Sequence, residues 1–220
     1  MLDDELIVIA KNQTKGRGQM HSNWQSHAGQ SLTFSVFKRF KDLSVLDQSQ
    51  ITFATTLGIE RALENLQVPS VSIKWPNDIM SYRKKLCGIL IENQTLGEKL
   101  SSSVIGIGLN VNETKFDNLN QATSMRLASG KPFNLEEVFS VIAEEILQSL
   151  QQINHKNLEK LKLAYEACLF RKDQVSVFED TLGAKFRGII RGVSNSGKLQ
   201  VELEDEILRE YELKQIKMLF

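Results

Sequence analysis

The segment from Ser72 to Glu92 carries the densest group of chemically capable side chains in this 220-residue chain. It contains Lys74-Trp75-Pro76-Asn77-Asp78 and, after a short spacer, Lys84-Lys85-Leu86-Cys87-Gly88. Lysines, an amide and a carboxylate close together can neutralise an anion or hold a hydrated metal ion. The apolar runs Val71 to Ile73 and Leu86 to Ile91 predict buried strands, so we expect this chemistry on a rigid sheet.

The pentapeptide contains its own turn signal. Pro76 cannot donate to a β-ladder and restricts Trp75 to extended backbone, so a strand must end or bulge there. The polar groups of Asn77 and Asp78 would then point out of the sheet, although an edge strand with a solvated turn is the alternative. Of Lys84 and Lys85, one ammonium could face a bound anion, but periodicity does not show which one.

A second polar group lies in a long loop near the N-terminus. Its members are Gln13, Gly16, Arg17, Gly18, Gln19 and Trp24. Glycines on both sides of Arg17 let the backbone approach an anion, while the guanidinium offers a fork of donors to phosphate or carboxylate. A structural turn is the alternative. A dinucleotide-binding motif is excluded, because His21 stands where a third glycine is needed and no helix follows.

Two further glycine-containing stretches have weaker signals. Gly106 to Asn110 predicts a strand end that a ligand's flat ring could approach, or else a bulge. Gly192 to Lys198 resembles a phosphate loop, but Leu199 replaces the required Ser or Thr and an alternating strand pattern follows. We therefore expect a hairpin turn at Asn195 to Gly197.

Hydrophobic periodicity predicts the elements that position these groups. Strands are expected at Leu6 to Ala10 (buried), Leu32 to Phe37 and Ser103 to Val111. Helices are expected after Ser44, after Asn134 and from Lys156 to Leu169, with Ser44 and Asn134 as caps. The polar segment 112–124 lacks periodicity and is expected to be mobile without a ligand. After Arg171, five short strands predict a small barrel.

Composition limits the class of protein. Lysine plus arginine and aspartate plus glutamate both number 27, so the net charge favours neither nucleic acid nor an anionic membrane as a partner. Cys87 and Cys168 form no CxxC pair, and His21, His27 and His155 lack metal-ligand spacing, so we expect neither a disulfide framework nor a zinc site. The acidic N-terminus and the absence of a long apolar run predict a soluble cytoplasmic protein. Cys87 precedes an apolar strand and is expected in the core.

In family order and spacing, the motifs resemble the catalytic region of a biotin protein ligase (biotin--[acetyl-CoA-carboxylase] ligase). The matching residues are Gln13, Gly16-Arg17-Gly18, Trp24, Lys74-Trp75-Pro76-Asn77-Asp78, Lys85 to Glu92 and Gly106 to Asn112. The resemblance covers nearly the whole chain. It implies an α+β fold in which a mixed β-sheet is backed by helices, similar to class II aminoacyl-tRNA synthetases. The implied domains are a catalytic domain at 1–170 and a small SH3-like β-barrel at 171–220.

The resemblance also implies a two-step reaction. Biotin and MgATP would form biotinyl-5'-AMP, and a lysine of a biotin carboxyl carrier protein of acetyl-CoA carboxylase would then accept the biotinyl group. Arg17 and Lys85 would be catalytic. Biotin or adenylate would contact Gln13, Gly16, Arg17, Gly18, Gln19, Trp24, Lys85 and Gly88. The nucleotide would contact Lys74, Asn77, Asp78 and Asn110, with Trp24 also on the adenine side and Asp78 as a Mg²⁺ ligand. Segment 112–124 would order over the adenylate.

The chain departs from the family pattern at two places. Many members continue the Gly-Arg-Gly motif with arginine, which helps retain the adenylate, and Gln19 stands there in this chain. A strand, a Ser/Thr-Thr-Asn motif and a helix usually precede the strand matching Leu6 to Ala10, and Met1 falls too late to encode them. Three interpretations stay open: a start codon assigned downstream of the true one, a fragment, or a degenerate relative that binds poorly. A winged-helix DNA-binding domain is not expected.

Three alternatives remain open on the sequence. A non-catalytic module would bind carrier protein or dimerise through an exposed sheet. A lipoate or octanoate transferase of related fold would have a longer apolar tunnel, although the Lys-Trp-Pro-Asn-Asp match favours biotin. The third alternative, nucleic-acid binding by the C-terminal strands, is remote, because acidic residues are mixed among the basic ones. We therefore expect a ligase with a carrier-protein partner, and a possible homodimer.

Overall fold

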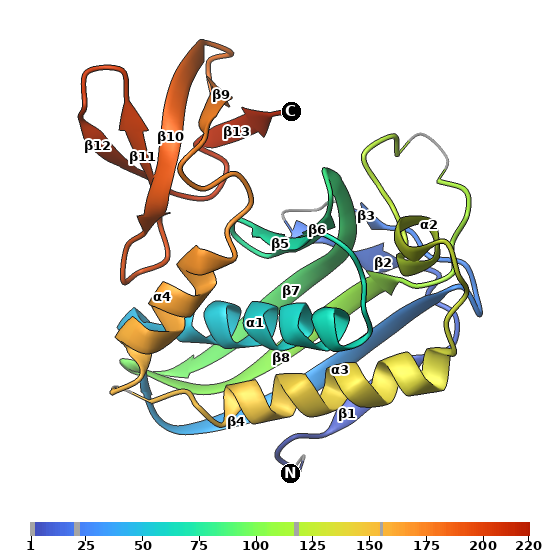
Figure 1. Ribbon diagram of the computed structural model, residues 1–220. Helices are drawn as coiled ribbons and strands as arrows, with labels where there is room; N and C mark the ends of the chain where they lie inside the picture. The colour runs from blue at the N-terminus through green and yellow to red at the C-terminus, as the bar shows by residue number, and fades with distance from the viewer. Residues whose placement is uncertain (1–2, 20–22, 117–118, 155) are drawn as a thin grey trace.

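Two β-sheets and a layer of helices form the protein, in a computed structural model that describes residues 3–19, 23–116, 119–154 and 156–220 (Figure 1). His21, His155 and two residues within segment 112–124 lie outside the described residues. No helix in the described part of the chain is long and apolar enough to cross a membrane.

The larger sheet has six strands in the order β1-β4-β8-β7-β6-β5, and every neighbouring pair is antiparallel. The strands are β1 (Ile7–Ala10), β4 (Ser31–Ser44), β5 (Val71–Lys74), β6 (Asp78–Ser81), β7 (Lys84–Leu96) and β8 (Lys99–Asn110). In the described residues, parallel pairing occurs only at isolated bridges. A short separate ladder joins β2 (Gly16–Arg17) to β3 (Asn23–Trp24).

Helices α1 (Ser49–Asn65) and α3 (Leu135–Leu150) cover one face of this sheet (Figure 1). Both helices bury apolar residues at helical spacing, which forms the main core against the sheet. Asn134 caps α3 as predicted, because its side-chain oxygen accepts the N–H groups of Glu136 and Glu137 at 2.8 and 3.2 Å. Helix α4 (Leu158–Ala167) leads from this layer to the second sheet (Figure 1).

The C-terminal sheet has five strands in the order β12-β11-β10-β9-β13. Its strands are β9 (Val175–Asp180), β10 (Lys185–Val193), β11 (Leu199–Leu203), β12 (Leu208–Tyr211) and β13 (Ile216–Leu219). All five strands were predicted, and so was the hairpin turn between β10 and β11. The order places β12 and β13 at the two edges, so closure into an SH3-like barrel stays a prediction.

The α+β fold with a helix-backed sheet is confirmed, but the larger sheet is antiparallel where a mixed sheet was expected. Two local predictions are also wrong, and one short helix was not predicted. The strand at Leu6 to Ala10 was expected to be buried, but β1 is an edge strand on which Val8 and Ile9 are 60% and 47% exposed. A run of a few apolar residues does not distinguish an edge strand from a central one. Ser44 caps a 3-10 helix, η2 (Val45–Asp47), and α1 begins only at Ser49. The short helix α2 (Met125–Ser129) directly follows segment 112–124 and was not predicted.

Candidate active site

One row of residues crosses the face of the larger sheet that α1 and α3 leave uncovered. Residues directly opposite each other in a ladder project to the same face, so the strand registers define such a row. From β1 to β5 the row reads Ala10, Thr33, Gly108, Gly88, Asp78 and Lys74. Antiparallel pairing therefore brings three separate sequence motifs into line across the sheet.

A cavity of about 1150 Å³ lies over this face and extends to the C-terminal sheet. Ten of the predicted site residues line it: Gln13, Arg17, Gly18, Gln19, Trp24, Lys74, Asn77, Asp78, Lys85 and Gly88. The two predicted catalytic residues, Arg17 and Lys85, thus share one cavity. This cavity is wide enough for two small substrates, since the six-strand row alone measures about 24 Å at the usual strand spacing.

Two predicted site residues lie elsewhere. Gly16 is absent from the lining of this cavity, and a Cβ atom there would lie 2.3 Å from the carbonyl oxygen of Trp24. Its missing side chain therefore permits the close β2–β3 pairing. Asn110 lines an adjacent cavity of about 380 Å³, whose walls also include Lys74, Asp78 and Lys85. The Asn110 amide donates a hydrogen bond of 3.0 Å to the carbonyl oxygen of Thr123.

The indole of Trp24 lies directly on the glycines of the row. A Cβ atom on Gly108 would lie 2.3 Å from Trp24 Cε2, and one on Gly88 would lie 3.1 Å from Trp24 Cζ3. The sequence predicted a ligand ring or a bulge at this strand end. The ladder from Asn110 to Ser102 continues without a bulge, and the ring upon it belongs to the protein. The Trp24 Nε1 donor is buried and has no partner.

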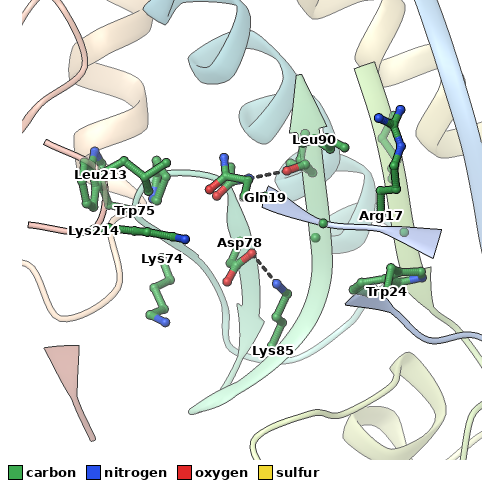
Figure 2. Close-up of a pocket in the computed structure, with 18 of the residues that line it drawn as sticks. Arg17, Gln19, Trp24, Lys74, Trp75, Asp78, Lys85, Leu90, Leu213 and Lys214 are labelled. Carbon is green, nitrogen blue, oxygen red and sulfur yellow. Dashed lines mark hydrogen bonds and ion pairs between the residues drawn. The ribbon is translucent and has the colours of Figure 1, made fainter. Parts of the chain in front are cut away.

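Lys85 is the lysine that faces the cavity. Its ammonium lies 2.7 Å from Asp78 Oδ1 and 5.9 Å from the centroid of the Trp24 ring, whereas Lys84 is exposed (Figure 2). The Lys85 backbone holds segment 112–124 to the sheet, because its N–H donates to Gln121 at 2.7 Å and its carbonyl accepts from Thr123 at 2.9 Å. The segment expected to cover the adenylate is therefore attached to the proposed catalytic lysine.

Arg17 forms a two-point ion pair with Glu92. The guanidinium nitrogens lie 3.1 and 2.8 Å from the two carboxylate oxygens, and the Arg17 side chain is 71% exposed. In Figure 2 the guanidinium points away from Lys85, with Trp24 below it. An ion pair this exposed contributes only about 0–1 kcal/mol, so a bound anion can compete with Glu92 for Arg17. The role of Glu92 was not predicted, since its partner lies 75 positions away.

Three parts of the fold hold the Lys74–Asp78 segment. Asn77 Nδ2 donates to the carbonyl oxygen of Ile89 on β7. Tyr165 of α4 donates its hydroxyl to the Pro76 carbonyl at 2.8 Å. The Trp75 indole donates to the Gly197 carbonyl at 2.8 Å, in the turn between β10 and β11. The turn that resembled a phosphate loop thus supports the site segment.

Burial shifts the pKa of two groups in this region. It lowers the pKa of Lys74; Lys85 and Lys217 lower that pKa further, and Asp78 partly opposes them. Burial also raises the pKa of the Cys87 thiol well above its ordinary value. Cys87 is fully buried and unpaired, which confirms its place in the core and disfavours a thiolate nucleophile.

The possible metal ligands of the cavity suit a magnesium ion that arrives with a nucleotide better than a permanently bound metal ion. In the part of the chain that the structure describes, no three His, Cys, Asp or Glu side chains converge on one position. Asp78 supplies a carboxylate at the cavity wall. Magnesium in proteins commonly takes one or two carboxylates and completes its shell with phosphates and waters.

Residues of the C-terminal sheet also line the main cavity, and the sequence analysis missed all of them. They are Phe178, Glu179, Asp180, Ile190, Leu199, Leu213, Lys214, Ile216, Lys217 and Met218. They reach the cavity only because one sheet docks on the other. No local pattern in the sequence could reveal them.

Comparison with known proteins gives a consistent result. A model of the Biotin/lipoate A/B protein ligase family matches residues 1–110. The chain is 29% identical over 209 residues to the bifunctional ligase/repressor BirA of Bacillus spizizenii, covering 93% of this chain and 64% of that protein. It is 25% identical over 199 residues to the biotin--[acetyl-CoA-carboxylase] ligase of Paracoccus denitrificans, covering 87% of this chain and 82% of that protein.

The fold has a counterpart among solved structures. The biotin protein ligase of Aquifex aeolicus in complex with biotin and ATP superposes with a TM-score of 0.80 at 25% identity, covering 99% of this chain and 90% of that one. The chain spans 64% of the length of the Bacillus spizizenii BirA and 62% of that of the Escherichia coli BirA.

Proposed function

Because the chain belongs to the Biotin/lipoate A/B protein ligase family, we propose that it is an ATP-dependent biotin protein ligase. The single observation that carries this proposal is the shared cavity of Arg17 and Lys85 above the row from Ala10 to Lys74. Two mutually repelling anions, a carboxylate and a polyphosphate, need fixed cations between them. The named relatives support biotin and ATP as those substrates.

In the first step, a carboxylate oxygen of biotin bonds to the α-phosphorus of MgATP. The bond from that phosphorus to the bridging oxygen breaks, and pyrophosphate leaves with the electron pair. Lys85 and Arg17 offset negative charge on the reacting phosphate and hold the two anions in place. In the second step, the amine of an acceptor lysine attacks the carbonyl carbon of the mixed anhydride, AMP leaves, and the amine loses a proton.

We assign the surrounding residues from the resemblance of their motifs to the family. Gln13, Gly18, Gln19, Trp24 and Gly88 would contact biotin or the adenylate, and Lys74, Asn77, Asp78 and Asn110 would contact the nucleotide. Asp78 would ligate the Mg²⁺ that arrives with ATP, which requires it to exchange its 2.7 Å contact with Lys85. Gly16 would act through the backbone geometry of β2 rather than by direct contact.

The domains, location and partners complete the proposal. Residues 1–170 would form the catalytic domain and 171–220 the SH3-like domain. A biotin carboxyl carrier protein would be the acceptor, and two unpaired cysteines fit a reducing cytoplasm. A homodimer would form at the exposed edge strand β1, which sedimentation at several concentrations would detect. The balanced charge gives no reason to add nucleic acid or membrane as partners.

The direct test mixes the protein with MgATP, biotin and an apo carrier domain. We expect the carrier to gain the mass of one biotinyl group on one lysine, and the gain to need ATP. Excess lipoate should not compete with biotin. If lipoate or octanoate is transferred in preference, the protein is an acyl transferase of the same family. Saturable carrier binding with no heat from biotin and ATP would instead identify a non-catalytic module.

A further inference from the structure

A buried carboxylate joins two segments that border the cavities. Glu113 follows β8, which ends at Asn110, and the Glu113 side chain is only 7% exposed. One carboxylate oxygen accepts the hydroxyl of Ser31, the first residue of β4, at 3.0 Å, and the other contacts Nδ1 of His27. A carboxylate is costly to bury unless hydrogen-bond donors or cations surround it. Ser31 and His27 therefore account for both oxygens of this carboxylate.

The side chain of Glu113 holds the connection that carries Trp24. This connection joins β3, which ends at Trp24, to β4, which begins at Ser31, and His27 lies within it. Glu113 contacts the connection at two points, His27 and Ser31. The indole of Trp24 in turn lies on Gly108 of the site. The side-chain contacts of Glu113 therefore help to fix where Trp24 lies.

The backbone of Glu113 is linked to Lys85 through two buried residues. The Glu113 carbonyl accepts the hydroxyl of Ser124 at 2.6 Å. The neighbouring Thr123 donates its N–H to the Lys85 carbonyl at 2.9 Å, and the Thr123 carbonyl accepts the Asn110 amide at 3.0 Å. A displacement of Glu113 would therefore move the residues that hold the backbone of Lys85.

We propose that Glu113 is a positioning residue, which holds Trp24 and Lys85 in place for adenylate formation. This proposal rests on the ligase function proposed above and adds a residue that lines neither cavity. Its side chain fixes the connection from β3 to β4, and its backbone fixes the residues beside Lys85. Small displacements of site groups lower reaction rates strongly, so a residue at this junction acts on the rate without contacting a substrate.

The test measures single-turnover formation of biotinyl-5'-AMP by the full chain at saturating biotin and MgATP. Glu113→Ala removes both side-chain contacts and should lower the rate about tenfold or more, with the KM for ATP within about threefold. Glu113→Gln should restore most of the rate, because its amide can accept from Ser31 and donate to a neutral His27. His27→Ala should also slow the reaction, and its side chain is 68% exposed, so this change leaves the core intact.

A double variant and a control separate positioning from loss of stability. His27→Ala and Glu113→Ala remove the same contact, so the double variant should be no slower than Glu113→Ala alone. Lys38→Ala on β4 is the matched control, because its ammonium lies 2.8 Å from Asp4 and 2.9 Å from Glu5, and Lys38 lines neither cavity. Lys38→Ala should lower the urea midpoint and leave the adenylate rate within about twofold of the wild type.

Amide hydrogen exchange at Thr123 tests the junction without the reaction. The Thr123 N–H should exchange about tenfold faster in Glu113→Ala and near the wild-type rate in Glu113→Gln. If the protein makes adenylate and Glu113→Ala makes it equally fast, the positioning role is wrong and the ligase stands. If the wild type makes no adenylate, the ligase function fails, and faster Thr123 exchange in Glu113→Ala still supports the junction. Unchanged Thr123 exchange in Glu113→Ala would overturn it.

Discussion

At the scale of single residues, the contact between Trp24 and Gly108 sets the floor of the site. Alanine at Gly108 would place a Cβ atom 2.3 Å from the indole, so we expect Trp24 to be displaced. Adenylate formation in Gly108→Ala should fall about tenfold or more, since small misplacement of site groups is costly. Stopped-flow measurement of pyrophosphate release gives the rate.

Gly106→Ala is the matched control for this change. A Cβ atom on Gly106 meets nothing closer than the Leu90 carbonyl at 3.5 Å, which is ordinary contact. This variant should keep nearly full activity. If the two alanine variants behave alike, the position of Trp24 does not shape the site.

Gln19 allows a second prediction at the residue scale. It lines the cavity, so Gln19→Arg would add a guanidinium that can reach the phosphate of the proposed adenylate. A hydrogen bond to a charged group contributes about 1.5–3 kcal/mol, which predicts release of the adenylate at least about tenfold slower. Trapping the released adenylate with a free amine measures the rate. An unchanged rate would show that position 19 lies too far from the phosphate.

At the scale of elements, the turn between β10 and β11 joins the C-terminal sheet to the site. It accepts a hydrogen bond from Trp75 at 2.8 Å and one from Ser49, at the start of α1, at 2.6 Å. Trp75→Phe and Ser49→Ala should each cost about 1 kcal/mol of unfolding free energy. Both hydrogen bonds need the same turn. The unfolding free energy lost by the double variant should therefore be smaller than the sum of the two single losses, by about 0.5 kcal/mol or more.

Urea titrations of the four proteins in this cycle give the coupling energy. Trp75→Phe combined with Ser140→Ala provides the control, since Ser140 donates only to Glu136 within α3. The losses in that pair should add. Additive losses for Trp75 and Ser49 would instead show that the turn does not couple α1 to the site segment.

Glu60 makes helix α1 sensitive to pH. Burial raises the pKa of its carboxyl group, and Glu64 raises it further. The folded protein therefore gains stability below the ordinary value of 4.5 and loses it as the pH rises through the folded pKa. Glu60→Gln removes this loss, so its Tm should exceed that of the wild type by a few degrees at pH 8 and by little at pH 4.

Thermal scans of both proteins at several pH values check this prediction. Glu144→Gln on the exposed side of α3 is the control and should shift the Tm little at either pH. A Glu60→Gln advantage that is the same at pH 4 and pH 8 would contradict a raised pKa.

An element was predictable from the sequence when the interactions that form it join residues close together in the chain. The strands over Leu32 to Phe37 and Leu86 to Ile91, the cap at Asn134 and the turn at Asn195 to Gly197 depend on local periodicity and turn chemistry. All four were predicted correctly. The exposure of β1 was not predicted, because it depends on whether another strand pairs with its outer side.

The site divides in the same way. Lys85, Asp78 and Arg17 were predicted from local motifs, and all three line the cavity. Other contacts join positions far apart in the chain. Arg17 pairs with Glu92, the Trp24 ring lies on Gly108, and Lys214 lines the cavity. Strand register and sheet docking create these contacts, and neither is encoded in a short segment.

At the scale of the whole molecule, two sheets share one cavity. The larger sheet supplies the row from Ala10 to Lys74 and the paired cations Arg17 and Lys85. The C-terminal sheet supplies the opposite wall and the turn that supports Trp75. The proposed ligase reaction therefore depends on fixed cations, brought from separate segments, that let a carboxylate react with a polyphosphate.

The formation of biotinyl-5'-AMP by Lys85→Ala and Lys84→Ala tests that claim most directly. The two lysines are neighbours, but Lys85 faces the cavity and Lys84 is exposed. We predict that Lys85→Ala lowers the single-turnover rate by about a hundredfold or more, while Lys84→Ala stays near the wild-type rate. Adenylate that forms equally fast in Lys85→Ala and the wild type would contradict the account.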